Sequence, residues 1–249
     1  MDTLAGRWAA LERHMKAYGP EGADPRPAVI LFHGCGGLRS HLDGYAEAAA
    51  ALGVRAFIID SYAARGWSRA FALSFVCSGL VLRGSERAGD VLAALDGVSN
   101  RPDVDASQVV LAGWSHGGWA IMDLMTMPLT SRGEAGISDA PAADLSGIKG
   151  LALIYPFVGP GALSRNRPWR RFPPSWAVIA RTDHLTTVNN AERVYGALKG
   201  AGGVIDTWIA EGTHAFDETT GMGPMRHDPE LTQAAIGRFS DFLQIRLDL

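Results

Sequence analysis

A serine flanked by glycines is the first feature of this sequence that could do chemistry. Residues 113–117 read GWSHG, which has the form G-x-S-x-G and centres on Ser115. An apolar run, Val109 to Ala112, precedes the motif, and a helical pattern of apolar residues begins at Gly117. This context predicts a tight strand-to-helix turn, which projects the serine Oγ from the carboxyl edge of a sheet. Ser115 is therefore a candidate nucleophile. The alternative is a glycine-rich turn whose serine only caps a helix.

A serine hydroxyl is a poor nucleophile unless a base removes its proton. The candidate bases are the histidines from the motif onward: His116, His184, His214 and His227. His214 comes soon after an apolar run, Val204 to Ile209, and so belongs on a loop at the same sheet edge as the serine. His116 is too close in sequence to turn back onto the hydroxyl, while His184 and His227 fit solvated loop or capping positions. We therefore predict His214 as the base.

The base needs an acid that orients its ring, and Asp183 is in the expected position. It follows the apolar run Trp176 to Ala180, one predicted strand before the His214 loop, which gives the chain order serine, acid, histidine. The other acidic residues considered fall in a polar stretch, inside a strand or on the helix after the serine: Glu134, Asp139, Asp144, Asp206 and Asp123. The alternative role for Asp183 is to cap a turn or a helix.

Negative charge that forms on a carbonyl oxygen during attack needs two backbone N–H groups to stabilise it. One is expected from His116, which directly follows the candidate nucleophile. The second is expected from the glycine-rich loop HGCGG, residues 33–37, with Cys35 as the first choice and Gly36 as the alternative. We predict that Cys35 contributes its backbone and not its thiol. The loop does not fit a G-x-G-x-x-G dinucleotide site, because Arg39 occupies the last position.

Aromatic residues near these candidates suggest a pocket that suits an acyl or aryl ester. We predict weak substrate contacts for four of them: Trp67, Trp114, Tyr155 and Phe216. Further aromatic candidates are Tyr62 and Phe157, which could equally belong to the core, and Trp119, for which a core position on its helix face is the simpler interpretation. Arginines that could bind a substrate carboxylate are Arg65, Arg69 and Arg83. For each arginine a structural or solvated role is the simpler interpretation.

Short apolar runs and amphipathic helices alternate along the chain and must position these residues. The predicted strands cover residues 28–32, 54–59, 108–112, 150–155, 176–180 and 204–209. The predicted helices cover residues 42–52, 85–98, 117–127, 189–199 and 229–245. Continuous apolar runs are typical of strands buried on both faces, so we expect a mostly parallel sheet with helices on both sides. No linker divides residues 1–249, which predicts a single α/β domain.

Three segments lie outside this alternation. Residues 1–26 are predicted as an N-terminal helix, Leu4 to Tyr18, followed by a proline-containing connector. Residues 131–147 and 159–174 are predicted as loop excursions from the sheet. Loops of this kind are where such folds keep their specificity.

Composition and charge exclude several classes of partner. The chain has 23 Lys and Arg against 26 Asp and Glu, so nucleic acid is not an expected partner. The longest uncharged stretches, residues 70–82 and 150–163, fall short of the roughly 18 residues that span a bilayer. The N-terminus has no secretory-signal pattern, and we expect a soluble cytoplasmic protein. For the two cysteines, Cys35 and Cys77, reduced thiols are the simpler expectation and one disulfide is the alternative.

Several motifs taken together resemble the dienelactone hydrolase-like branch of the α/β-hydrolases. They are the serine motif, the HGCGG loop, the string THAFD at residues 213–217, the string DSYAARG at residues 60–66, Cys77 and the pair Arg87 and Asp90. The resemblance extends over residues 28–243, nearly the whole chain. It implies an α/β-hydrolase fold and the catalytic trio Ser115, Asp183 and His214, the same residues that the motif positions predict.

The chain departs from this family pattern at three places. Relatives that open dienelactones use a cysteine where this chain has Ser115, which favours cleavage of general carboxylic esters over dienelactone hydrolysis. A glycine often begins the acid loop where this chain has Ala180. Two N-terminal strands that are common in larger relatives have no predicted counterpart, so we expect a sheet that is shortened on its N-terminal side.

The predicted activity is that of a serine hydrolase, a carboxylesterase that acts through an acyl-enzyme on a small-molecule ester. We expect no cofactor and no metal, because the chain has no HExxH motif and no close set of His and Cys ligands. One alternative is a small-molecule receptor that keeps the trio and turns over slowly. Others are an oligopeptidase of the same fold, although such enzymes usually carry a large extra domain, and an inactive relative.

Overall fold

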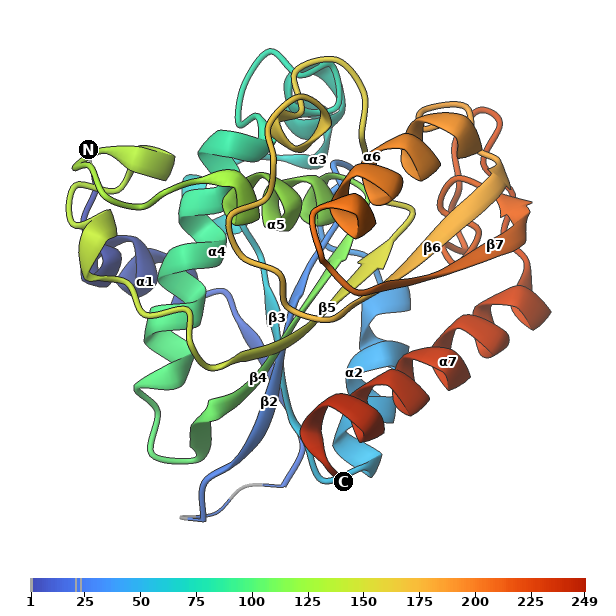
Figure 1. Cartoon of the computed structure of the whole chain (residues 1–249). Coiled ribbons are helices and arrows are strands. Elements are labelled where there is room, and N and C mark those ends of the chain that lie inside the picture. Colours follow the sequence, from blue (N-terminus) through green and yellow to red (C-terminus); the bar gives the residue numbers. More distant parts are fainter. Residues whose placement is uncertain (1, 21, 23) are drawn as a thin grey trace.

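A seven-stranded sheet runs through the centre of the structure, a computed structural model that describes residues 2–20, 22 and 24–249 (Figure 1). Its strands are β1 (Lys16–Tyr18), β2 (Arg26–Phe32), β3 (Arg55–Ile59), β4 (Val104–Trp114), β5 (Ile148–Ile154), β6 (Ser175–Thr182) and β7 (Ile205–Thr213). Their order across the sheet is β1-β3-β2-β4-β5-β6-β7. All neighbours pair in parallel except β1, which runs antiparallel to β3. The predicted α/β fold with a mostly parallel sheet is confirmed.

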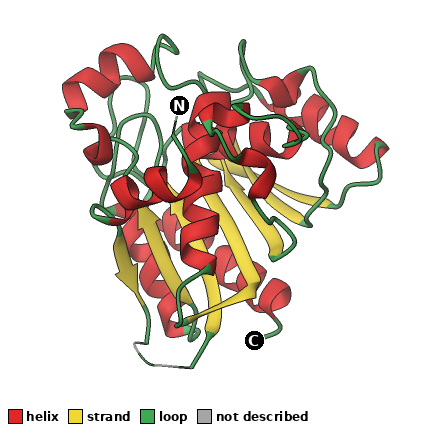
Figure 2. Cartoon of the chain, turned by 90° about the vertical axis from the view of Figure 1, so that its left-hand side faces the viewer, coloured by secondary structure: helices red, strands yellow, loops and turns green. Residues whose placement is uncertain are grey.

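Helices cover both faces of this sheet, and its strands twist progressively from one edge to the other (Figure 2). The helices are α1 (Leu4–Glu12), α2 (His41–Ala51), the single turn α3 (Arg69–Phe71), α4 (Gly84–Ser99), α5 (His116–Thr126), α6 (Val188–Gly200) and α7 (Pro229–Leu247). One apolar core joins one sheet face to α1, α4, α5 and α6, and the other joins the opposite face to α2 and α7. Because both faces are buried, the inner strands are continuous apolar runs.

The N-terminal segment differs from its predicted form. The helix ends at Glu12, and Lys16–Tyr18 form the edge strand β1. Met15 packs on one apolar core and Tyr18 on the other, so the two side chains lie on opposite faces of the sheet. A spacing of three residues puts side chains on one face of a helix but on opposite faces of a strand. The expectation of a helix through Tyr18 is therefore wrong. Positions 21 and 23 of the predicted connector lie outside the described residues.

The two excursions lead to different parts of the molecule. In residues 131–147, the Ser138 N–H donates to the carbonyl of Asp2 and Asp139 accepts from the N–H of Leu4, so this segment packs beside α1. In residues 159–174, the Ser164 N–H donates to Asp123 on α5. The second excursion thus lies beside the helix that follows the candidate nucleophile.

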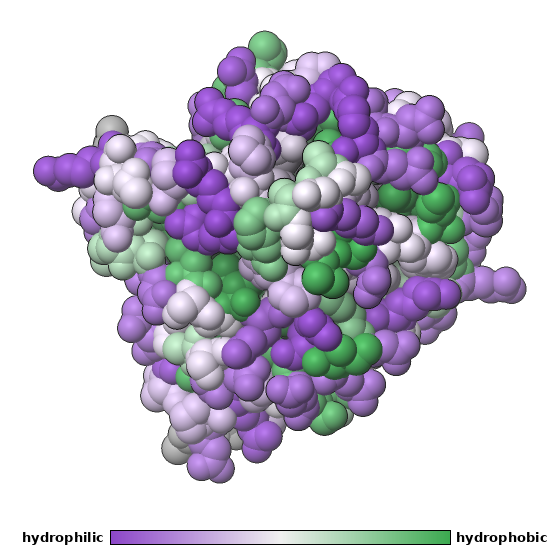
Figure 3. Space-filling model, in the orientation of Figure 1, coloured by the Kyte–Doolittle hydropathy of each residue, from purple (hydrophilic) through white to green (hydrophobic). Residues whose placement is uncertain are grey.

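The surface in Figure 3 is mostly hydrophilic, with apolar areas interspersed among charged and polar residues. Among the residues that the structure describes, no helix combines the length and the apolar character needed to cross a bilayer.

Candidate active site

Ser115 lies on the turn between β4 and α5, where the sequence predicts a strand-to-helix elbow. Its backbone has φ 48° and ψ −108°, a conformation that L-residues rarely adopt. A Cβ on Gly113 would lie 2.5 Å from the backbone nitrogen of Gly118, and one on Gly117 would lie 2.1 Å from the carbonyl oxygen of Phe32. Both glycines are therefore needed for the turn to pack against the sheet.

The structure brings Ser115, His214 and Asp183 into one hydrogen-bonded row. The distance from Ser115 Oγ to His214 Nε2 is 2.8 Å, and that from His214 Nδ1 to Asp183 Oδ2 is 2.7 Å. All three residues are buried, with 6%, 2% and 8% of their surface exposed. The other carboxylate oxygen of Asp183 accepts the N–H groups of Leu185 and Thr186, which fixes the carboxylate plane. In this arrangement the imidazole can take the serine proton while the carboxylate orients the ring.

The loop after β2 lies against the serine turn. A Cβ on Gly34 would lie 3.5 Å from the Cβ of Ser115, and Cys35 and His116 both line the cavity beside the serine. The backbone groups predicted to stabilise an oxyanion are thus on the two segments that meet at the nucleophile.

A buried arginine connects these two segments from behind. The guanidinium of Arg87 donates to the carbonyl of His33 at 2.7 Å and lies 3.1 Å from His116 Nδ1. Burial, together with the charge of Arg87, lowers the pKa of His116 to about 3, so this ring is neutral at physiological pH. A neutral ring with Nδ1 facing a donor carries its proton on Nε2. His116 therefore contributes no charge to the site.

A second buried charged group, Asp90, lies on the same helix as Arg87. Asp90 is fully buried and accepts from Arg65 and Arg7. Burial alone would raise the pKa of Asp90, but the two arginines hold it below its ordinary value. Arg65, one of the predicted carboxylate binders, is thus engaged by a protein carboxylate.

Asp217 is a structural anchor that the sequence analysis did not single out, although it ends the THAFD string. Its buried carboxylate accepts from the Tyr45 hydroxyl and from Trp114 Nε1, each at 3.0 Å, and from the Tyr155 hydroxyl. Burial and the nearby Asp217 carboxylate raise the pKa of Tyr155 well above its ordinary value. The Tyr155 ring lies 4.9 Å from the His214 ring between centroids. These bonds fix the His214 loop to α2 and to the ends of β4 and β5.

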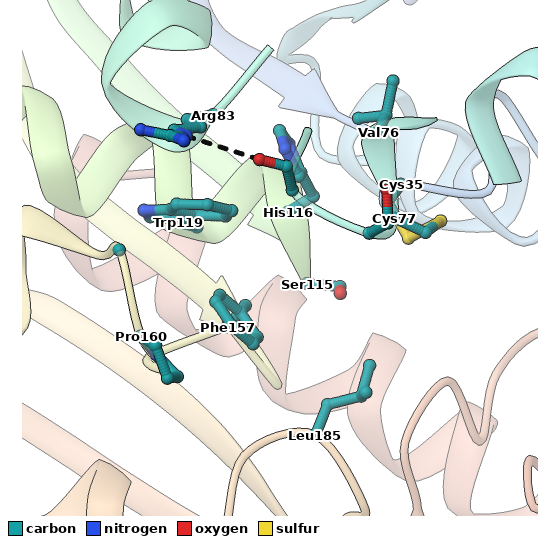
Figure 4. Close-up of a pocket in the computed structure, with 13 residues that line it drawn as sticks. Cys35, Val76, Cys77, Arg83, Ser115, His116, Trp119, Phe157, Pro160 and Leu185 are labelled. Atoms are coloured by element: carbon teal, nitrogen blue, oxygen red, sulfur yellow. Dashed lines mark hydrogen bonds between the residues drawn. A yellow bond between two sulfur atoms is a disulfide. The ribbon is translucent and has the colours of Figure 1, made fainter. Parts of the chain in front are cut away.

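A cavity of about 370 Å³ opens beside Ser115. Figure 4 shows Trp119 and Phe157 on one side of the serine and the two cysteines on the other. The Trp119 and Phe157 rings are 5.0 Å apart between centroids. Trp119 Nε1 donates to Asp123, which also holds the second excursion, and burial raises the pKa of Asp123 to about 6.

Of the four predicted substrate contacts, none lines this cavity. Trp114, Tyr155 and Phe216 lie in the core beneath the site, with at most 2% of their surface exposed. Trp67 lines a separate hollow with Tyr62. The aromatic walls are instead Trp119, for which the sequence favoured a core role, and Phe157, which it left equally open to a core role. Closeness in sequence to the candidate catalytic residues could not separate cavity-lining aromatics from core aromatics. Trp114 and Tyr155 lie in the core because each donates a hydrogen bond to Asp217.

The two cysteines are bonded to each other. Cys35 and Cys77 form a disulfide with Cα atoms 5.1 Å apart. The expectation of two reduced thiols is therefore wrong, and the alternative holds. The reason is the path of the chain after β3, which returns across the loop of Cys35 through α3 and the π-helical turn Ala72–Val76. The bond thus links the predicted oxyanion loop to a wall of the cavity.

Comparisons with known proteins found a family match over part of the sequence and several solved structures of similar fold. The model of the dienelactone hydrolase family matches residues 15–134. Among curated protein sequences, none matches the chain.

Solved structures of similar fold include a presumed dienelactone hydrolase from Klebsiella pneumoniae subsp. pneumoniae, with a TM-score of 0.65 and 17% identity over 92% of each chain. Esterase 2 of Thermogutta terrifontis phosphonylated by sarin has a TM-score of 0.63 and 16% identity, over 93% of this chain and 89% of that one. A dienelactone hydrolase-like promiscuous phosphotriesterase from metagenomic libraries has a TM-score of 0.63 and 15% identity, over 93% of this chain and 92% of that one. These structures share the α/β fold of the chain, and residues 15–134 match the family that its sequence motifs resemble.

Proposed function

We propose that this protein hydrolyses carboxylic esters of small molecules, with Ser115 as nucleophile, His214 as general base and Asp183 as the residue that orients His214. The observation that carries the proposal is the continuous row from hydroxyl to imidazole to carboxylate, which opens into a cavity with aromatic walls. Each member of the row has the hydrogen-bond partner that its role requires.

The reaction proceeds in two halves. His214 Nε2 takes the proton of Ser115 as Oγ attacks the ester carbonyl, and the N–H groups of Cys35 and His116 stabilise the oxyanion. The tetrahedral intermediate collapses, His214 donates the proton to the departing alcohol oxygen, and an acyl-serine remains. A water molecule then gives a proton to His214 and attacks the acyl carbon. His214 returns this proton to Ser115 Oγ as the second tetrahedral intermediate collapses and the acid leaves.

Two of the structural neighbours are linked to organophosphorus chemistry, which supports the proposal of an activated nucleophile. One neighbour is an esterase captured as a phosphonylated protein, and another is a promiscuous phosphotriesterase. We propose that Ser115 reacts with organophosphorus reagents in the same manner.

Intact mass after incubation with a fluorophosphonate tests the proposal. We expect one adduct on the parent, no adduct on Ser115→Ala, and an unchanged adduct on the control Ser74→Ala, which alters an exposed serine. Steady-state turnover of ester substrates by the parent separates an enzyme from a receptor that binds and turns over slowly. A folded parent that forms no adduct and turns over no ester would refute the proposal.

A cytoplasmic location is a separate prediction, and the disulfide removes one of its premises, because such bonds persist mainly in oxidising compartments. Alkylation of free thiols in freshly lysed cells, followed by intact mass, measures the state of Cys35 and Cys77. A cytoplasmic protein should carry two alkylated cysteines.

A further inference from the structure

Ser115 lies between two hollows of very different size. Beside the cavity of about 370 Å³ there is a second hollow of about 70 Å³, which also reaches the serine. The two share Cys35, Cys77, Ser115 and Leu185. The disulfide and Leu185 therefore stand at the boundary between the hollows.

The catalytic groups are divided between these hollows. His116 lines the large hollow and not the small one, whereas His214 lines the small one and not the large one. Cys35 lines both. The two predicted oxyanion donors thus both border the large hollow, and the proton carrier borders the small one.

This division assigns the two halves of an ester. The alcohol oxygen must accept a proton from His214 Nε2 as it departs, so the alcohol lies on the side of His214. The acyl carbon bonds to Ser115 while its oxygen points to the N–H groups of Cys35 and His116, so the rest of the acyl group must leave in another direction. With the alcohol in the small hollow, the large hollow is the space that remains for it. We propose that the preferred substrates are esters of a bulky or aromatic acid with a short alcohol, an inference that rests on the proposed function.

The dimensions set the expected sizes. At about 70 Å³ against about 370 Å³, the small hollow suits a short alcohol such as methanol or ethanol and not one that carries an aromatic ring. Leu73, Met222 and Met225 enclose it. The large hollow lies within the range of about 300–1,000 Å³ typical of small-molecule sites. Its Trp119 wall is held by the hydrogen bond to Asp123 and contacts the Phe157 ring, so an acyl ring can pack against this pair of aromatic side chains.

A pair of isomeric esters tests the assignment. Methyl phenylacetate and benzyl acetate contain the same atoms, but the first carries its ring on the acyl side and the second on the alcohol side. The measurement is kcat/KM for each, divided by the rate constant for hydroxide-catalysed hydrolysis of the same ester. We expect the normalised ratio to favour methyl phenylacetate by at least about tenfold, the discrimination that a poorly fitting apolar group produces.

Two variants identify the hollows that cause the preference. Leu73→Ala enlarges the small hollow and should raise kcat/KM for benzyl acetate severalfold, with little change for methyl phenylacetate. Phe157→Ala removes one aromatic wall and should lower kcat/KM for methyl phenylacetate, with little change for ethyl acetate. The control Ser74→Ala, on the same segment as Leu73, should leave kcat/KM unchanged for all three esters.

The outcomes separate this inference from the function on which it rests. A normalised ratio near one, or one that favours benzyl acetate, overturns the size assignment while the esterase proposal stands. Failure of the folded parent to hydrolyse either isomer or ethyl acetate overturns the proposed function, and the inference with it.

Discussion

The carboxylate of Asp217 predicts a measurable difference between two buried tyrosines. The Tyr155 hydroxyl donates to Asp217, whereas the hydroxyl of Tyr195, on α6, has no hydrogen-bond partner among the described residues. Both side chains are almost fully buried, at 2% and 1% exposure. Replacement of each by phenylalanine removes one oxygen atom and changes the shape of the core little.

The expected loss of stability in Tyr155→Phe follows from the negative charge of the Asp217 carboxylate that accepts the hydrogen bond. A hydrogen bond to a charged group contributes about 1.5–3 kcal/mol, so Tyr155→Phe should lower the free energy of unfolding by about 2 kcal/mol. Tyr195→Phe removes a hydroxyl that gave up its hydrogen bonds to water on folding and found no partner in the protein. The substitution should therefore be neutral or stabilise the fold by up to about 1 kcal/mol. In an Asp217→Asn background, where the acceptor is neutral, the cost of Tyr155→Phe should fall to about 1 kcal/mol.

Urea unfolding at neutral pH, followed by tryptophan fluorescence, measures the free energy of unfolding of all five proteins: the parent, the three single variants and the double variant. The reasoning is refuted if Tyr155→Phe costs no more than Tyr195→Phe, or if its cost is the same with Asp217 and with Asn at that position. Either result would mean that the carboxylate does not hold the His214 loop.

Three further predictions concern the site and its walls. Asp183→Asn should lower kcat by on the order of 10³–10⁴, because the amide favours the wrong tautomer of His214, and a kcat equal to the parent's would identify another orienting group. Reduction of the Cys35–Cys77 bond by dithiothreitol should slow fluorophosphonate labelling and raise the relative turnover of benzyl acetate, and the reagent should have no such effect on Cys77→Ala. The raised pKa of Asp123 means that its carboxyl stabilises the fold below its unfolded pKa of about 4 and loses that contribution as the pH rises through 6. The free energy of unfolding of the parent, relative to Asp123→Asn, should therefore fall by about 3 kcal/mol between pH 4 and pH 7, and a flat difference would contradict the shift.

The arrangement of the candidate trio could be predicted because parallel strands share one carboxyl edge. Ser115, Asp183 and His214 each follow an apolar run, so their approach needs only the alternation of strands and helices, which the structure confirms. The roles of the three residues stay a prediction until they are tested.

The remaining features depend on contacts that sequence position does not reveal. Trp114 lies next to the nucleophile in sequence, yet its indole N–H is drawn into the core by Asp217, 103 residues away. The disulfide depends on the return of the chain over a separation of 42 residues. The strand β1 was missed because a spacing of three between Met15 and Tyr18 fits a helix face as well as two faces of a strand.

The disulfide also bears on how the protein can choose between substrates. The segment from α3 to Cys77 is held at its C-terminal end by a covalent bond to the loop of Cys35, and it cannot swing away from the site as a free lid would. Enzymes with free lids can couple recognition to closure, at some expense of catalytic power. Here the oxidised protein would present the walls already in place, and discrimination between esters would come from preorganised shape and not from induced fit.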